Sequence, residues 1–248
     1  MSKKVEWIVG WHAVQSLLET DFSRLLELFV DEDRHDARAT QLLAQAVEQG
    51  IIIQKVSRKT LDKLTDHSSH QGIAARCKIS PAIHENWLYE QLQPLENALL
   101  LILDGVQDPH NLGACLRSAD AAGAMAVVVP QDRAVGLTPT VRKTACGAAD
   151  SVPLVQVTNL ARCLRTLQQH GVQLIGLAGD AQKSLYQMPL RGKIALILGA
   201  EDKGLRRLTR EHCDEVVQIP MLGQVESLNV SVAAGICLFE AVRQRILS

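Results

Sequence analysis

The sequence predicts an α/β protein with a small first domain and a larger second domain built on an open parallel sheet. Short apolar runs alternate with segments of helical periodicity along the 248 residues, as expected where helices cover a sheet. A polar stretch with Pro81 and Pro94 interrupts this alternation. Several later runs are almost wholly apolar, which is typical of parallel strands buried on both faces.

The first domain is expected over residues 1–78. LLELFV at 25–30 and GIIIQKV at 50–56 read as strands, and the Ala, Gln and Leu residues of 37–49 form a helix between them. This order predicts a small α/β sandwich. The polar stretch 79–97 is expected to be a linker with one short helix.

The second domain is expected over residues 98–248. Its predicted strands are 98–103, 124–129, 152–157, 172–178, 194–199 and 215–220. Ligands of open parallel sheets bind outside the carboxyl ends of the strands. The residues that follow each run are therefore the candidates for function.

Composition excludes several classes of protein. The net charge of −1 offers no global attraction for nucleic acid, so an RNA partner would need local basic patches. No apolar segment reaches 18 residues, and six scattered cysteines without a C-x-x-C pair indicate reduced thiols. We expect a cytoplasmic protein without a membrane span. We also expect no metal site, because the H-x-x-H pair of His67 and His70 lies in a loop-like stretch.

The first unusual strand end reads LDGVQDPHNLGACLRSAD. It leads into a helix predicted from about residue 111 to 122. Arg117 follows Gly113 by one turn, so a phosphate could approach its guanidinium over a position without a side chain. The alternative is that Asn111 caps the helix and Arg117 is a solvated charge.

The second strand end reads ILGAEDKGLRRLTR. Gly199 and Gly204 allow a ligand to approach the backbone, but their spacing fits neither the dinucleotide fingerprint nor a phosphate loop. That absence counts against a nicotinamide dehydrogenase. Arg206 and Arg207 could neutralise phosphates, or they could belong to a solvated helix face.

The third strand end reads IPMLGQVESLNVSVAAGICLFEAVRQR. An amphipathic C-terminal helix is predicted from apolar residues at steps of three and four, namely Leu228, Val232, Ile236, Phe239, Val242 and Ile246. Ser227 or Asn229 lies at its start. These side chains could cap the helix or orient a substrate hydroxyl.

In order and content, the three stretches resemble the three motifs of the SpoU branch of the SPOUT methyltransferases. The resemblance covers residues 98–248, and VGWHAV at 9–14 and HQGIAARC at 70–77 are similar to the family's substrate-binding domain, which has an L30e-like fold. It implies a C-terminal sheet with a trefoil knot, a homodimer and S-adenosylmethionine as methyl donor. The run GLRRLTREHCDE, followed by SLNVSV and GICLFEAVRQR, is similar to a subgroup of this family. The resemblance therefore implies methylation of the ribose 2′-hydroxyl of a guanosine in 23S rRNA, or in an assembly intermediate that contains it.

The resemblance also implies roles for individual residues. The catalytic positions that match the motifs are Asn111, Arg117, Glu201, Ser227 and Asn229, and the cofactor would be held through the backbone of Gly199, Ile219 and Leu228. Asp202 replaces a glycine that is common in the second motif, which puts cofactor affinity in question.

Methyl transfer to a hydroxyl needs alignment and removal or sharing of the hydroxyl proton. The family suggests Arg117 at the 2′-hydroxyl, as a base helped by a substrate phosphate. A charged Arg117 that only positions the hydroxyl is the alternative, since an arginine pKa above about 12 makes deprotonation expensive.

Aromatic residues make up only 3% of the chain, so RNA shape, phosphates and 2′-hydroxyls should carry recognition. Lys55, Arg58 and Lys59 are the first domain's candidates for RNA contact, beside Arg206 and Arg207 of the second. Two other functions stay open: a tRNA ribose methyltransferase of the same family, and an RNA-binding protein without catalysis.

Overall fold

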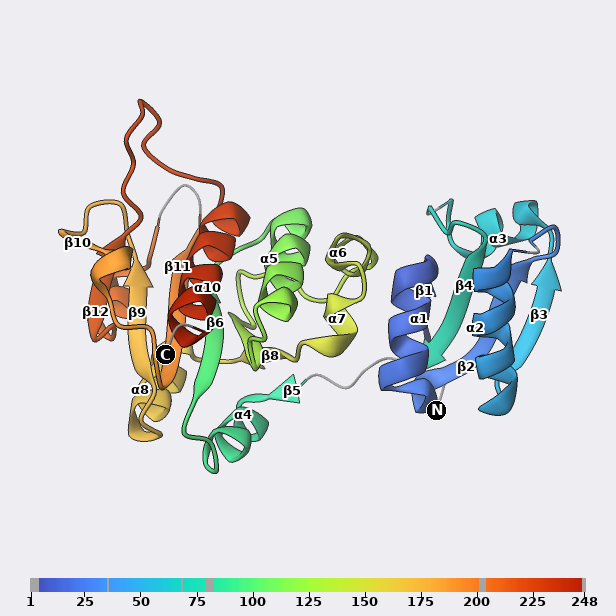
Figure 1. The fold of residues 1–248 in the computed structure, drawn as a ribbon, viewed down its shortest axis with the longest axis horizontal. Coiled ribbons are helices and arrows are strands. Elements are labelled where there is room, and N and C mark those ends of the chain that lie inside the picture. Colours follow the sequence, from blue (N-terminus) through green and yellow to red (C-terminus); the bar gives the residue numbers. More distant parts are fainter. Residues whose placement is uncertain (1–4, 35, 68, 79–82, 201–203, 247–248) are drawn as a thin grey trace. The chain divides into compact units, whose positions relative to one another are not determined.

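The computed structural model describes residues 5–34, 36–67, 69–78, 83–200 and 204–246 (Figure 1). The chain divides into two compact units. The first contains residues 1–81 and 142–151, and the second contains 82–141 and 152–248. No helix in the described ranges is long and apolar enough to cross a membrane.

The first unit is built on a four-stranded mixed sheet. The strand order is β1-β4-β2-β3, in which β4 runs antiparallel to both neighbours and β2 and β3 are parallel. The strands are β1 (Val5–Val9), β2 (Leu25–Asp31), β3 (Ile52–Val56) and β4 (Ile73–Lys78). The two strands predicted for this domain are therefore confirmed as β2 and β3.

Helices cover both faces of this sheet. On one face, α1 (Trp11–Thr20) and α2 (Ala37–Glu48) bury apolar side chains against the strands, and α3 (Arg58–Leu64) packs Leu61 on the other face beside Phe29. A short 3-10 turn, Phe22–Arg24, leads into β2. The predicted α/β sandwich is thus present.

Residues 142–151 belong to the first unit, although the sequence pattern assigned them to the second domain. They contain the end of α6 (Pro139–Ala145) and all of α7 (Ala148–Ser151). Gly147 has φ +98°, and a Cβ there would come within 3.2 Å of the Ser16 Cβ on α1. The absence of a side chain therefore permits this close packing.

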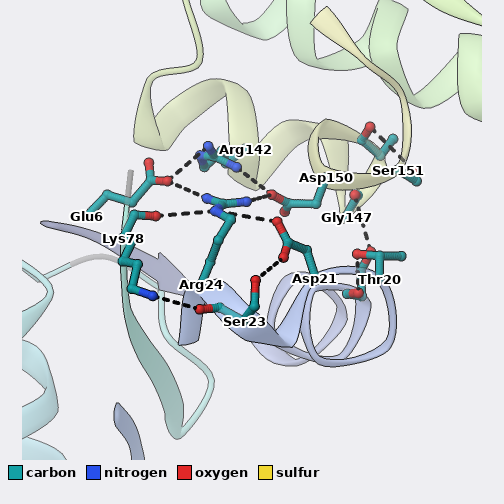
Figure 2. Close-up of polar contacts among 12 residues, drawn as sticks. Glu6, Thr20, Asp21, Ser23, Arg24, Lys78, Arg142, Gly147, Asp150 and Ser151 are labelled. Atoms are coloured by element: carbon teal, nitrogen blue, oxygen red, sulfur yellow. Dashed lines mark hydrogen bonds and ion pairs between the residues drawn. The ribbon is translucent and has the colours of Figure 1, made fainter. Parts of the chain in front are cut away.

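A buried network of four charged side chains holds the same segment (Figure 2). Arg142 donates to Asp150 at 2.7 Å and to Glu6 at 3.2 Å. Arg24 donates to Glu6 at 2.6 Å and lies 3.5 Å from Asp150. Each carboxylate therefore contacts both guanidinium groups, which compensates the charges inside the fold.

The second unit is built on an eight-stranded sheet in the order β10-β12-β9-β11-β6-β7-β8-β5, and every pairing is parallel. All six predicted strands are present, as β6 (Ala98–Asp104), β7 (Ala126–Pro130), β8 (Leu154–Val157), β9 (Gln173–Leu177), β11 (Lys193–Gly199) and β12 (Glu215–Gln218). Two-residue strands β5 (Ile83–His84) and β10 (Lys183–Ser184) extend its edges. The parallel α/β fold is confirmed, and the trefoil knot stays a prediction.

Helices cover the central strands of this sheet on both faces. Every residue of β6 is buried. Leu100 and Ile102 pack with α4 (Glu85–Leu92) and α8 (Leu160–Gln169) in one core. On the other face, α5 (Pro109–Ala121) and α10 (Val230–Ile246) lie side by side over β6 and β11 (Figure 1). The predicted helix at 111–122 begins two residues early and ends one residue early.

The segment expected to link the domains is largely part of the second unit. Residues 79–82 lie outside the described residues. From Ile83 onward the chain forms β5 and α4, and Leu88 and Leu92 are fully buried in the core. The segment is mostly polar, so its composition did not indicate that Leu88 and Leu92, one turn apart on a short helix, would be buried.

Candidate functional site

A cavity lies at the carboxyl ends of β9 and β11 in the second unit. Its walls come from the ends of these strands, the segment that follows β12, and the first turn of α10. The lining residues are Leu177, Ala178, Gly179, Leu198, Gly199, Ala200, Gly204, Ile219, Met221, Glu226, Ser227, Leu228, Val230 and Ala233. The three positions expected to hold a cofactor, and Ser227, therefore lie around one cavity.

The chain turns sharply where β11 enters this cavity wall. Gly204 N donates to the Ala200 carbonyl at 2.8 Å. A Cβ on Gly199 would lie 2.0 Å from the Gly204 carbonyl carbon and oxygen. Only glycine fits at position 199, because the returning backbone occupies the space that any side chain would need.

A second cavity adjoins the first. It is lined by Gly105, Val106, Gln107, Asp108, Asn111, Ala200 and Val230. Ala200 and Val230 line both cavities, so the loop after β6 and the start of α5 meet the wall described above. The first and third motifs thus face neighbouring spaces.

A hydrogen bond joins these two motifs directly. Asn229 Nδ2 donates to Asn111 Oδ1 at 2.9 Å. Asn229 Oδ1 accepts from Ser231 N at 2.9 Å and so caps α10. The capping alternative for Asn229 is therefore confirmed, and its role toward a substrate hydroxyl stays a prediction.

The start of α5 differs from the expected cap. Asp108 caps the helix by accepting from His110 N at 3.0 Å, and Asn111 is a buried residue within the helix, 8% exposed. Gly113 is buried as well, so it offers no open path for a phosphate to Arg117. The expected approach of a phosphate to Arg117 over Gly113 is therefore wrong.

Arg117 lies away from both cavities. It is exposed on α5 and lines neither of them. It follows Asn111 by six positions, which places it about 9 Å further along the helix axis and about 120° around it. Within one chain, the structure does not bring these two motif residues together.

The remaining sequence candidates are dispersed. Glu201 and Asp202 lie outside the described residues. Lys55 is on β3 and Arg58 and Lys59 are on α3, all exposed on the first unit. Arg207 is exposed and pairs with Glu211 at 2.7 Å.

Arg206 has a contact that the sequence did not predict. Its backbone N–H and its side chain both donate to Asp104, the buried last residue of β6. Part of its charge is therefore compensated within the chain. The only sequence signal for Asp104 was an acidic residue closing an apolar strand.

Thiol chemistry does not fit the site. Burial raises the pKa of Cys237 on α10 to about 12 and that of Cys213 to about 11. Both groups therefore stay protonated near neutral pH, and a thiolate nucleophile is disfavoured.

The two parts of the chain each match a known family. Residues 98–239 match the SpoU rRNA methylase family, and residues 7–82 match the RNA 2′-O ribose methyltransferase substrate-binding family. The chain belongs to the SpoU rRNA methylase family. The resemblance inferred from the motifs is thereby confirmed.

Relatives within the family match nearly the whole chain. The 23S rRNA (guanosine-2'-O-)-methyltransferase RlmB of Photobacterium profundum is 57% identical over 240 residues, 97% of this chain and 98% of the relative. The protein of the same name from Escherichia coli (strain K12) is 55% identical, with 97% and 99% covered. A crystal structure of an RNA 2'-O ribose methyltransferase, 29% identical, covers 99% of this chain and 90% of its own with a TM-score of 0.79.

Proposed function

We propose that the chain transfers a methyl group from S-adenosylmethionine to the ribose 2′-hydroxyl of a guanosine in 23S rRNA, in the cytoplasm. The observation that carries the proposal is the hydrogen bond between Asn111 and Asn229, which joins two motifs beside a cavity lined by Gly199, Ile219 and Leu228. The relatives named for this reaction, at 55% and 57% identity, support the choice of substrate.

The cavity suits the proposed methyl donor. Leu177, Leu198 and Met221 provide apolar walls for an adenine ring, and the tight backbone at Gly199 leaves peptide groups at the wall. Glu226 also lines the cavity and would place a carboxylate near a cationic sulfonium. The bound cofactor would supply an electrophilic methyl group.

The protein's part in the reaction is to align the acceptor hydroxyl and handle its proton. Asn111, held by Asn229, would order the acceptor in the second cavity. Arg117 is assigned to the 2′-hydroxyl, either as the base that takes its proton with help from a substrate phosphate, or as a fixed positive charge that stabilises the oxygen while the phosphate takes the proton. Ser227, at the wall of the first cavity, and Glu201 would order substrate and cofactor.

RNA contact is assigned mainly to the first unit. Its exposed cations Lys55, Arg58 and Lys59 would bind backbone phosphates, with Arg207 adding a contact on the second unit. Replacing the three first-unit cations by glutamate should weaken RNA binding and leave cofactor affinity unchanged.

The active form is proposed to be a homodimer. Val232, Phe239 and Ile246 lie seven residues apart on one side of α10 and are 49%, 49% and 75% exposed. The buried side of α10 uses other residues, including Ala234, Cys237, Leu238 and Ala241. An apolar stripe opposite the core favours cover by a second copy.

The dimer would also supply the missing arginine. Arg117 is exposed on α5, which packs beside α10, so a copy seated on α10 would lie close to it. An equimolar, randomly paired mixture of Arg117→Ala and Asn111→Ala chains, each inactive alone, should then recover about a quarter of the activity, because about half of the dimers are mixed and each has one intact site of two. Recovery of none would place Arg117 at the site of its own chain. Phe239→Glu should convert the dimer to a monomer in light scattering.

The substrate is tested by offering unmodified 23S rRNA and unmodified tRNA with labelled S-adenosylmethionine. We expect label in the rRNA only, and none with Asn111→Ala. Label in tRNA alone would retain the chemistry and overturn the substrate. Label in neither would favour an RNA-binding protein without catalysis.

A further inference from the structure

Asp104 is a buried carboxylate next to residues that line the two cavities. It is the last residue of β6, only 1% exposed, and its register partner on β11 is Gly199. The next residue, Gly105, has φ +92° and begins the loop that lines the second cavity. Asp104 therefore directly precedes the loop of the first motif and lies beside Gly199 of the second motif.

Arg206 satisfies this carboxylate with three groups. Its backbone N–H donates to Asp104 Oδ2 at 3.1 Å, and its Nε donates to Oδ1 at 2.5 Å. Its Nη2 completes an ion pair with the same carboxylate. A buried carboxylate needs such partners, and hydrogen bonds between charged groups are the strongest of their kind.

This contact lies close to a tight approach of two backbone segments. Gly204 N donates to the Ala200 carbonyl, and the Gly204 backbone packs against Gly199. Arg206 comes two residues after Gly204 and binds the last residue of β6. The Asp104–Arg206 contact therefore holds the chain at Gly204 against the end of β6.

The segment so held forms the walls of both cavities. Gly199, Ala200 and Gly204 line the first cavity, and Ala200 also lines the second. A shift of this segment would change the cofactor cavity and the position of Asn111 relative to it. Neither Asp104 nor Arg206 lines either cavity, so they act through the backbone that they hold.

We propose that Asp104 and Arg206 form a positioning pair that sets the shape of the cofactor cavity and aligns it with the neighbouring substrate cavity. The proposal rests on the proposed function, since it takes the first cavity to hold S-adenosylmethionine. Arg206 would then bind Asp104 within the protein, in place of the RNA phosphate contact that the sequence suggested for it.

The test is calorimetric binding of S-adenosylhomocysteine by the full-length protein. Arg206→Met should raise its Kd roughly tenfold or more, because a charged hydrogen-bond pair is lost. Arg206→Lys should restore part of the affinity. Asp104→Asn combined with Arg206→Met should be no weaker than the worse single variant, because the two residues act as one unit.

Matched measurements separate positioning from simple destabilisation. Arg165→Met removes an exposed arginine from α8 and should bind as wild type does. Tm is measured for every variant. A Kd that stays at the wild-type value for a folded Arg206→Met would overturn the positioning role. Wild-type protein that fails to bind S-adenosylhomocysteine would instead overturn the proposed function, and this pair's role with it.

Discussion

Asn229 at the start of α10 donates a hydrogen bond of 2.9 Å to Asn111 on α5, across 118 positions of sequence. The same Asn229 side chain caps α10 through Ser231 N. One asparagine thus fixes the end of a helix and the side chain of a residue that lines the second cavity.

Removing either asparagine should therefore abolish most of the activity. We expect Asn111→Ala and Asn229→Ala each to lower kcat by about a hundredfold or more, because the acceptor loses its alignment. The double variant should be little worse than either single one. Single-turnover methyl transfer measures this, with the exposed Asn86→Ala on α4 as the control. Full additivity of the two losses would contradict a shared role.

Arg117 can act as a base or as a fixed positive charge, and the pH dependence distinguishes the two. A fixed charge predicts that Arg117→Lys loses only a modest part of the rate and leaves the pH–rate profile unshifted. A profile displaced to lower pH in the lysine variant would show that the residue at 117 itself titrates during catalysis. The measurement is the single-turnover rate across pH, with cofactor saturating.

Gly199 should tolerate no side chain. In Gly199→Ala the new Cβ would overlap the Gly204 backbone at 2.0 Å, so the turn must open. Loss of S-adenosylhomocysteine binding and a lower Tm are expected. Gly223→Ala is the matched control for Tm, because a Cβ at that position meets nothing within 4 Å. An unchanged Kd in Gly199→Ala would mean that this turn does not shape the cavity.

The buried charge network of the first unit should contribute strongly to stability. Asp150→Ala leaves Arg24 and Arg142 with Glu6 as their shared remaining carboxylate in the network, and we expect a loss of about 3 kcal/mol in the free energy of unfolding. Urea unfolding followed by tryptophan fluorescence reports this unit through Trp7 and Trp11 once Trp87 of the second unit is replaced by phenylalanine.

The control removes an exposed carboxylate instead. Glu19→Ala, in the same unit, breaks the exposed i,i+4 hydrogen bond with Gln15 on α1 and should change stability by no more than about 0.5 kcal/mol. Equal losses for the Asp150 and Glu19 variants would refute the distinction between buried and exposed pairs.

Cysteine labelling tests burial across both units. Burial raises the pKa of Cys77 to about 12 and that of Cys163 to about 11. The pKa values of Cys213 and Cys237 are raised as well. A raised pKa lowers the thiolate fraction at pH 8, so these four should resist iodoacetamide. The exposed Cys146 should react quickly. Rapid modification of any of the four in folded protein would contradict the packing.

The sequence predicted the sheets better than the parts between them. Uninterrupted apolar runs such as that of β6 identify strands buried on both faces, and all six in the second unit were found. Residues 142–151 escaped prediction because the contacts that place them in the first unit are with Glu6, Ser16 and Arg24, far away in the chain. No local pattern encodes such a contact.

Only part of the candidate site was predicted, again because its contacts join segments that are far apart in the sequence. The motifs identified Asn111 and Asn229, but their hydrogen bond and the cap role of Asp108 needed the fold. Periodicity placed α10 correctly, yet it could not show that Phe239 faces away from the core while Leu238 is buried. The role of Asp104 was not predicted, because its partner Arg206 lies in the loop after β11 and not near it in the sequence.

Methyl transfer to the ribose is measured in the RNA product itself. Methylated 23S rRNA should yield, after alkaline hydrolysis, one resistant dinucleotide that begins with a 2′-O-methylguanosine, and none should form with Asn111→Ala. Label recovered on a base, or a ribose label on a nucleotide other than guanosine, would contradict the account.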